Sequence, residues 1–224
     1  FNIEGITPPL SYKGELVQGE YSGRLLEAIE YAKNRHLDCL CLQETYNMED
    51  GGYRTAYGWM LYYAGNGMSQ GEKSGVAILV PPHRQQYVKD VIVQSYRLMA
   101  AMFAVTGGEL AVITYHTPWD LKDYNTKRKL KSEDPNNLIN PEQSDQFFKD
   151  LNDLDDKIGS YPMKILIGDA NLRLHARQPG EQNVLGPYIW GAGQQVLNDI
   201  MHDRAKRKQQ SNRERWLKFA VSKQ

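Results

Sequence analysis

Short runs of apolar residues alternate with polar turns along most of the chain, which predicts several β-strands. Two nearly continuous apolar stretches, at 37–43 and 163–168, predict buried strands, the first of them central in its sheet. The other predicted strands cover 57–65, 76–82, 86–96, 98–105 and 109–116. A Thr-Gly-Gly turn at 106–108 joins the last two of these as a hairpin. The middle of the chain is therefore expected to consist of consecutive strands.

Helical periodicity is found near both ends of the chain. A helix is predicted over 21–36, with Ser22 placed to cap its start. Its expected buried face consists of Leu25, Ile29 and Ala32. A second helix is predicted over 141–159, with Pro141 near its start and Gly159 at its end. Its expected buried face consists of Phe147, Leu151, Leu154 and Ile158. Further helical patterns cover 194–210 and 212–221.

The order of these elements predicts the fold class. Strands outnumber helices, and hairpins join the middle strands, which favours an α+β fold of two mixed sheets packed face to face with helices outside. No segment has the composition of a linker, so we expect one domain over 1–224. The long polar segments at 119–140 and 175–193 are typical of binding or active-site loops.

Composition narrows the class of protein. The chain has 224 residues, of which 41% are hydrophobic and 24% charged, as in a globular domain. Its 27 basic residues balance its 27 acidic ones, so only local patches can argue for nucleic acid. Cys39 and Cys41 lie two residues apart on one predicted strand, and we expect free, buried thiols. With no signal peptide or bilayer-length apolar run, we expect an intracellular protein, nuclear or cytoplasmic, without a membrane partner.

Polar side chains stand at the ends of several predicted strands. Glu44 follows the first buried strand, His116 ends the strand at 109–116, and Asp169 ends the last one, with Asn171 close behind. Asn2 lies at the end of the first short apolar stretch. If these strands are neighbours, the side chains converge, and carboxylates with waters are what Mg²⁺ prefers. A nearby His and Asn would complete the parts needed for metal-assisted phosphodiester hydrolysis.

Each of these residues also has an ordinary structural interpretation. Glu44 fits the first solvated residue after a strand, and His116 fits a structural turn before Thr-Pro. Asp169 and Asn171 fit an Asx turn, since both residue types bond their own backbone. Only the combination and order favour a site: Asn, then Gln-Glu, then His-x-Pro, then Gly-Asp-x-Asn.

These motifs resemble those of the endonuclease/exonuclease/phosphatase superfamily, which has the DNase I-like fold. "LDCLCLQET" is similar to the strand that carries its metal-ligand Glu, and "LIGDANLRL" is similar to its Gly-Asp-Phe-Asn motif. "SGVAILV", "YRLMAAMF" and "NRERWLKFAV" are closest in style to endonuclease domains of LINE-type retrotransposons. The resemblance implies a four-layer α/β-sandwich, in which two packed mixed sheets are flanked by helices.

The resemblance also implies a role for each matching residue. Glu44 would bind Mg²⁺ or Mn²⁺, and Asn2 would support the metal or the scissile phosphate. Asp169 would orient or deprotonate the attacking water, and Asn171 would bind a phosphate oxygen. His116 stands where many family nucleases carry Tyr, and would act as the general acid on the leaving oxygen. A His in that role is expected to titrate near neutrality, unlike a Tyr.

One family motif has no counterpart in the sequence. The family normally ends with a strand region carrying Ser-Asp-His, and the chain contains no such tripeptide. His202 precedes Asp203 within a helical pattern, in the wrong order for this motif. The resemblance therefore implies a fold that is incomplete at its C-terminal end. A fragment, a degenerate copy, or a second chain that supplies the remainder all fit this pattern.

Basic and aromatic residues lie beside the predicted site. The loop that follows His116 carries residues suited to phosphates and bases, and a solvated lysine-rich loop is the alternative. The predicted nucleic-acid contacts are Arg97, Trp119, Lys122, Lys127 and Arg128. A basic stretch at 204–218 fits a nucleic-acid patch or an exposed helix face equally.

The sequence as a whole predicts a metal-dependent phosphodiesterase, a DNA endonuclease of the retrotransposon type. Two alternatives remain open at this point. One is a phosphoesterase of the same fold that acts on RNA or on phosphorylated lipids. The other is a catalytically impaired or dead domain that binds nucleic acid or protein, which the missing Ser-Asp-His motif favours.

Overall fold

Short antiparallel strands form the first of two sheets in the structure, a computed structural model. It describes residues 2–3, 23–47, 49–65, 74–118, 141–160, 163–172, 180–185 and 212–223. The strands of the first sheet are β1 (Leu40–Gln43), β2 (Gly51–Arg54), β3 (Met60–Ala64) and β4 (Val76–Val80). They are arranged in the order β1-β4-β3-β2, and every pair is antiparallel.

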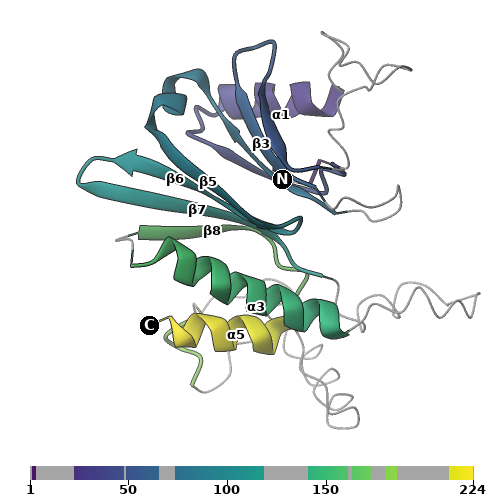
Figure 1. The fold of residues 1–224 in the computed structure, drawn as a ribbon, viewed down its shortest axis with the longest axis vertical. Helices are drawn as coiled ribbons and strands as arrows, with labels where there is room; N and C mark the ends of the chain where they lie inside the picture. Colours follow the sequence, from purple (N-terminus) through teal and green to yellow (C-terminus); the bar gives the residue numbers. More distant parts are fainter. Residues whose placement is uncertain are drawn as a thin grey trace, which may run out of the picture. The chain divides into compact units, whose positions relative to one another are not determined.

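The second sheet is a meander completed by one parallel strand. Its strands are β5 (Val88–Ser95), β6 (Leu98–Val105), β7 (Gly108–His116) and β8 (Met163–Asp169). The order is β5-β6-β7-β8, and β8 joins β7 in parallel. In Figure 1, β6, β7 and β8 run side by side. A 3₁₀ helix, η1 (Pro82–Tyr87), leads from β4 into β5.

Three helices are described: α1 (Gly23–Asn34), α3 (Pro141–Ile158) and α5 (Asn212–Ser222). The chain divides into two units, Phe1–His116 with Asp150–Asp169, and Thr117–Lys149 with Ala170–Gln224. Both sheets and α1 belong to unit 1, α5 belongs to unit 2, and the boundary falls within α3. The expectation of a single domain stays a prediction. No helix within the described residues combines the length and apolar character that crossing a membrane requires.

Two apolar layers hold unit 1 together, and β4 contributes to both. All five residues of β4 are buried, because alternate side chains of a strand point to opposite faces. Ala77 and Leu79 pack in the cluster that contains the buried face of α1. Ile78 and Val80 pack between the sheets, with Met99 and others of the second sheet. The predicted α+β fold with two packed sheets is therefore confirmed.

The outer face of the second sheet meets the C-terminal half of α3. The predicted buried stripe of this helix is confirmed, since Phe147, Leu151, Leu154 and Ile158 are all buried. Within unit 1, Lys157 Nζ donates to Gln94 Oε1 of β5 at 2.6 Å. Lys164 Nζ of β8 bonds Asp155 Oδ1 at 2.7 Å. These two bonds attach the helix to both edges of its sheet.

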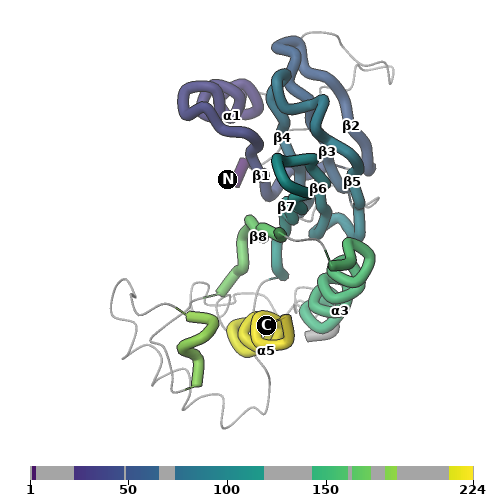
Figure 2. The backbone as a smooth tube through the Cα atoms, turned by 90° about the vertical axis from the view of Figure 1, so that its left-hand side faces the viewer, coloured from purple at the N-terminus to yellow at the C-terminus, as the bar shows by residue number. Residues whose placement is uncertain are grey.

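Two strands were predicted wrongly in one respect each. β1 was expected to be central, but it ends the order of the first sheet, and its only further pairing in the described chain is an isolated bridge between Gln43 and Asn2. β8 was expected to be buried, but it is an edge strand next to β7 (Figure 2), with Met163 53% exposed and Ile165 40% exposed. An apolar run does not distinguish an edge strand from a central one, because that depends on partners distant in sequence.

Candidate active site

A strained turn presents Glu44 at the end of β1. Glu44 and Tyr46 both have left-handed backbone, with φ 58° and 56°. Non-glycine residues adopt this conformation at an energetic cost, so the surroundings must enforce it. Here Thr45 N donates to Gly75 O at 3.3 Å and Tyr46 N donates to Ser74 O at 2.8 Å. The segment that enters β4 therefore fixes the direction in which the Glu44 side chain leaves the sheet.

Both carboxylate oxygens of Glu44 accept hydrogen bonds. Asn2 Nδ2 donates to Oε1 at 2.8 Å, and the Tyr46 hydroxyl donates to Oε2 at 3.0 Å. Asn2 is held beside β1 because Ile3 N donates to Gln43 O at 3.0 Å. The carboxylate is half-buried, and its orientation is set from two sides. The predicted pairing of Asn2 with Glu44 in one site is present in the structure.

His116 and Asp169 meet at the same edge of the second sheet. They are paired residues of the parallel strands β7 and β8, which end together. Gln43 Nε2 donates to Thr114 Oγ1 at 3.2 Å and so ties the end of β1 to β7. The charges of Asp169 and Glu44 both act on the His116 ring. Thus three of the predicted strand-end residues do converge within unit 1.

The His116 ring is wholly buried. Its side chain has no exposed area, and neither ring nitrogen has a hydrogen-bond partner among the described residues. Burial, together with the nearby Arg97 charge, lowers the His116 pKa to about 4 against the opposing pull of the two carboxylates. The expectation that this ring titrates near neutrality is therefore wrong. A histidine with this pKa is uncharged at pH 7.

Arg97 lies directly beside His116. Its Nη1 donates to the His116 carbonyl oxygen at 3.3 Å, and the Arg97 carbonyl accepts from His116 N at 2.9 Å. The guanidinium carbon lies 5.0 Å from the centre of the Tyr96 ring. The Arg97 Nε is buried without a hydrogen-bond partner in the described part of the chain. Arg97, for which the sequence allows a phosphate contact, a supporting contact or a surface position, lies beside His116 with its Nε unpaired among the described residues.

Asn171 belongs to unit 2 and is held by other residues of that unit. It has φ 42°, and its Nδ2 donates to the Thr117 carbonyl. Asn212, the first residue of α5, is buried and donates through Nδ2 to Pro118 O at 2.7 Å and to Asn171 O at 3.4 Å. Trp216 Nε1 donates to Thr117 Oγ1 at 3.3 Å. Helix α5 therefore fixes the segments that follow β7 and β8 in sequence.

Comparison with known families identifies the chain. Its sequence matches the model of the Endonuclease/Exonuclease/phosphatase family over residues 1–194. The chain belongs to this family. The resemblance drawn from the Gln-Glu-Thr and Gly-Asp-x-Asn motifs is confirmed at this level. No curated protein sequence matches the chain.

Solved structures similar to this family member include two of TDP2 and one retrotransposon domain. Humanized D. rerio TDP2 is 21% identical, with 68% of this chain and 60% of that chain covered and a TM-score of 0.38. D. rerio TDP2 complexed with single strand DNA product is 20% identical, covering 66% and 53%, with a TM-score of 0.37. The endonuclease domain of TRAS1, a telomere-specific non-LTR retrotransposon, is 15% identical, covering 90% and 69%, with a TM-score of 0.41. The chain spans less than two thirds of the length of both TDP2 chains.

The donor set around Glu44 fits a hard divalent cation. Its carboxylate is oriented by a hydrogen bond from the side-chain nitrogen of Asn2. The side-chain carbonyl oxygen of Asn2 remains as a second oxygen ligand for a cation. Mg²⁺ is commonly held by one or two protein oxygens with waters completing its shell. No group of three or more His, Cys, Asp or Glu side chains suited to a metal occurs within the described ranges. The residues therefore fit a mainly hydrated Mg²⁺ or Mn²⁺ and not a closed protein cage.

Several predicted features lie outside the described residues. They are the contacts Trp119, Lys122, Lys127 and Arg128, the N-cap Ser22 and the helix at 194–210. Two residues that hold predicted site residues in place were missed by sequence reasoning: Tyr46 of unit 1, which bonds Glu44, and Asn212 of unit 2, which bonds the Asn171 carbonyl. Tyr46 lies two residues beyond Glu44, and the left-handed backbone of the turn is what brings its hydroxyl to the Glu44 carboxylate. Asn212 carried no signal beyond its place at the start of a predicted helix.

Proposed function

We propose that the protein is a metal-dependent phosphodiesterase that cleaves DNA, in the manner of a retrotransposon endonuclease. Membership of the Endonuclease/Exonuclease/phosphatase family supports the general class. The observation that carries the proposal is the group of unused polar atoms beside two carboxylates. The Arg97 Nε and both His116 ring nitrogens are buried without a hydrogen-bond partner among the residues that the structure describes, and the charges of Asp169 and Glu44 reach the same ring.

A phosphodiester suits this arrangement chemically. Buried donors without acceptors destabilise a fold by about 1–3 kcal/mol each unless a partner arrives. Phosphate oxygens are strong acceptors, and an arginine beside a neutral N–H donor gives them both charge and direction. Arg97 would then bind a non-bridging oxygen of the phosphate, and His116 would donate from its ring N–H. The family resemblance implies that Asn171 also binds a phosphate oxygen.

The two carboxylates would take the remaining roles, which are metal binding and activation of water. Glu44 and the carbonyl oxygen of Asn2 would hold Mg²⁺ or Mn²⁺, which when bound neutralises charge on the phosphate. Asp169 would orient the attacking water and accept its proton, since it ends a rigid strand at the same sheet edge. His116 is uncharged near neutral pH, so we assign it a hydrogen bond to the leaving oxygen in place of delivery of a proton from a cationic ring. The leaving oxygen would take its proton from solvent water, and the proton accepted by Asp169 would return to solvent.

A supercoiled-plasmid nicking assay with Mg²⁺ tests the proposal. Nicking that is lost with EDTA and in Asp169→Ala, and kept in Asp90→Ala, supports it. Asp90 is a matched control because it is an exposed aspartate on β5, outside the group of site residues. Absence of nicking by a folded, monodisperse sample contradicts the proposal for this chain.

The same experiment separates the proposed substrate from its rivals. Parallel reactions with single-stranded RNA and with a phosphorylated inositol lipid give relative rates for the three substrate classes. Faster cleavage of RNA or lipid than of DNA overturns the DNA assignment but keeps the phosphodiesterase. Binding of DNA without cleavage of any substrate favours the catalytically impaired binding domain.

A further inference from the structure

A cavity lies in unit 1, at the opposite end of strands β1 and β7 from Glu44 and His116. It has a volume of about 520 Å³, within the range of ligand-binding pockets. Cys39, which precedes β1, lines it, whereas Glu44 follows the other end of that strand. Leu110 lines it near the start of β7, whereas His116 ends β7. Six residues of extended chain separate Leu110 from His116 by roughly 20 Å. The cavity is therefore distinct from the candidate active site.

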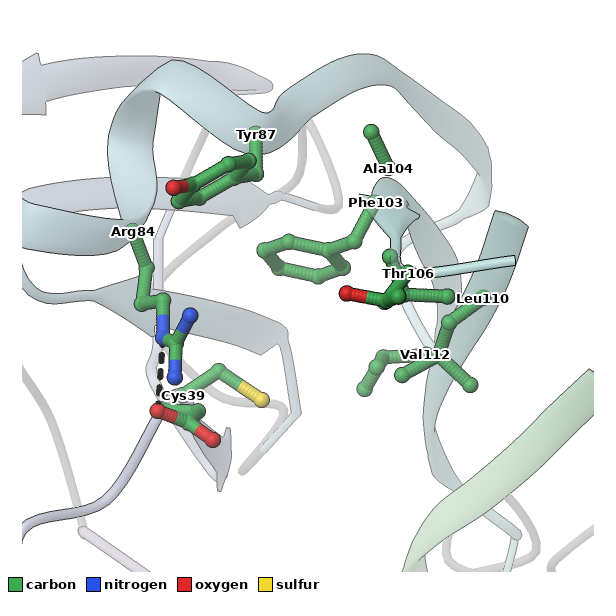
Figure 3. A pocket seen from close by; sticks show the side chains of 10 residues that line it. Cys39, Arg84, Tyr87, Phe103, Ala104, Thr106, Leu110 and Val112 are labelled. Atoms are coloured by element: carbon green, nitrogen blue, oxygen red, sulfur yellow. Dashed lines mark hydrogen bonds and ion pairs between the residues drawn. The ribbon is translucent and has the colours of Figure 1, made fainter. Parts of the chain in front are cut away.

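One wall of the cavity is apolar and rigid. Phe103, Leu110 and Val112 form it, and they also pack in the core between the two sheets. Figure 3 shows these side chains on one side of the cavity, with Arg84 and Cys39 facing them from the other. The Tyr87 ring borders the same space. Two aromatic rings and two aliphatic side chains thus offer a surface suited to a flat, apolar ring.

The opposite wall carries a fixed ion pair. Arg84 Nε donates to Asp38 Oδ1 at 2.7 Å. This bond leaves the two terminal NH₂ groups of the guanidinium and the second oxygen of Asp38 for a further partner. The wall therefore offers a hydrogen-bond donor next to an acceptor, and the formal charges of the two side chains cancel. A neutral ligand with an acceptor beside a donor complements this wall better than an anion does.

Helix η1 holds the arginine and the tyrosine in place. Arg84 N donates to Pro81 O at 3.0 Å, and Gln85 Nε2 donates to Gly58 O at 2.6 Å. The Arg84 guanidinium carbon lies 5.9 Å from the centre of the Tyr87 ring. These contacts hold Arg84 and Tyr87 in place before any ligand arrives, which lowers the ordering cost of binding.

We propose that this cavity binds a nucleobase, an uncharged flat heteroaromatic ring with a hydrogen-bond acceptor beside a donor. The acceptor of the base bonds a terminal NH₂ group of Arg84, and its donor bonds the free oxygen of Asp38. The ring lies against Phe103 and Leu110. Guanine has this edge, with O6 beside N1–H. The inference is independent of the proposed cleavage reaction, since it uses none of the residues of the candidate active site.

The Cys39 thiol supplies a built-in reporter for the test. It is free and half-buried at the cavity, whereas Cys41 is buried in the core. Burial and the Asp38 charge raise the pKa of Cys39 to about 11, so alkylation by N-ethylmaleimide is expected to be slow and measurable by mass spectrometry. A Cys41→Ser background leaves a single thiol to follow. A ligand that fills the cavity slows this alkylation.

Guanosine is the probe, and O6-methylguanosine is its matched control because methylation removes the N1 hydrogen. We expect guanosine to protect Cys39 and to show a calorimetric Kd about 10-fold tighter than the control. A second set of measurements uses a short single-stranded oligonucleotide that ends in guanine. If the oligonucleotide protects Cys39 at a lower concentration than guanosine does, the natural ligand is a base carried on nucleic acid. If guanosine protects at the lower concentration, the natural ligand is the free nucleoside, and both results support a nucleobase site.

Protein variants test the polar wall directly. Arg84→Gln and Asp38→Asn are each expected to weaken guanosine binding about 10-fold. Arg35→Gln is the matched control, since Arg35 lies 4.9 Å from the ring centre of Tyr31 on α1 and contributes nothing to the cavity lining. Equal binding of guanosine and O6-methylguanosine to the unaltered protein overturns the proposal. So does equal weakening by Arg35→Gln, or tighter binding of benzoate than of guanosine, which would indicate a carboxylate site.

Discussion

The polar side chains at the turn after β1 and at the end of β7 have opposite environments. Glu44 is half-buried, and both of its oxygens accept hydrogen bonds from neighbouring side chains. The His116 ring is fully buried, and no described residue bonds either of its nitrogens. Both residues belong to one candidate site, since the Glu44 charge acts on the His116 ring.

This difference indicates which of the two side chains is already positioned for its role before substrate binds. A carboxylate that is oriented and partly hydrated can hold a cation. An imidazole removed from water loses its proton instead, because burial disfavours the charged form. The site therefore contributes an oriented carboxylate at β1 and a neutral donor at β7. Four experiments test this difference between the two groups.

Replacement of Glu44, the carboxylate of the compared pair, should have the largest effect on activity. Glu44→Gln removes the carboxylate that would hold the cation, so we expect nicking activity to fall by at least about 1000-fold, equivalent to several kcal/mol of transition-state stabilisation. Glu109→Gln is the matched control, because Glu109 is half-buried near the start of β7, far along the strand from the site. Activity of Glu44→Gln within tenfold of the unaltered protein would remove the cation role.

The buried histidine should make stability depend on pH. Its pKa is lowered from 6.5 to about 4 in the folded chain. The unfolded chain therefore binds the proton first as pH falls. The stabilisation is fully present above pH 6.5 and is lost between pH 6.5 and pH 4, by up to about 3 kcal/mol. Urea unfolding at several pH values should show this loss, and His116→Gln should reduce its slope. Equal slopes in the two proteins would show that the ring is solvated.

The strained turn that orients Glu44 can be tested at the glycine behind it. Gly75 has φ +103°, and a Cβ there would lie 3.2 Å from Tyr46 N and against Thr45 Oγ1. We expect Gly75→Ala to lower the free energy of unfolding by about 2–3 kcal/mol. Gly107→Ala is the control, since its φ is +88° with nothing within 4 Å, and should lose only about 1 kcal/mol. Similar losses in both variants would mean that the turn yields easily.

The smallest effect is expected from the hydroxyl that bonds Glu44. Tyr46→Phe keeps the ring and the left-handed backbone but removes the donor to Oε2. Partners that orient a metal ligand typically change metal affinity by about 10–100-fold. Titration of Mn²⁺ monitored by electron paramagnetic resonance should show weaker binding of this size. Tyr53→Phe, in a tyrosine that packs beside Tyr63 in the first sheet, serves as control. Unchanged Mn²⁺ affinity in Tyr46→Phe would leave Asn2 as the partner that matters.

The sequence predicted most strands well because their signals are local. The stretch 98–105 was predicted with the bounds that β6 has, since an apolar run and a Thr-Gly-Gly turn mark both ends. β2 was missed because it opens with two glycines, which usually weaken a strand. In the structure a larger residue would be crowded at both positions: a Cβ on Gly52 would lie 3.1 Å from Leu61 O, and one on Gly51 would meet the Tyr63 ring.

The residues of the site could be predicted from the sequence, but their burial and hydrogen bonds could not. Glu44, His116 and Asp169 each end a recognisable strand, so their meeting followed from the order of motifs. Burial of the His116 ring was not predictable, because it depends on side chains from both sheets and on Arg97. The Tyr46 bond to Glu44 depends on two left-handed residues that no composition signal marks.

The parallel pairing of β8 with β7 sets the order in which the site can assemble during folding. β5, β6 and β7 follow one another in sequence and form a meander, so their contacts close short loops and are expected to form early. β8 reaches β7 only after the chain has passed through α3, and closing that long loop is entropically slower. Asp169 is carried by the late strand, whereas His116 is carried by a strand of the early meander. A chain in which only the meander has formed is therefore expected to remain inert until β8 docks.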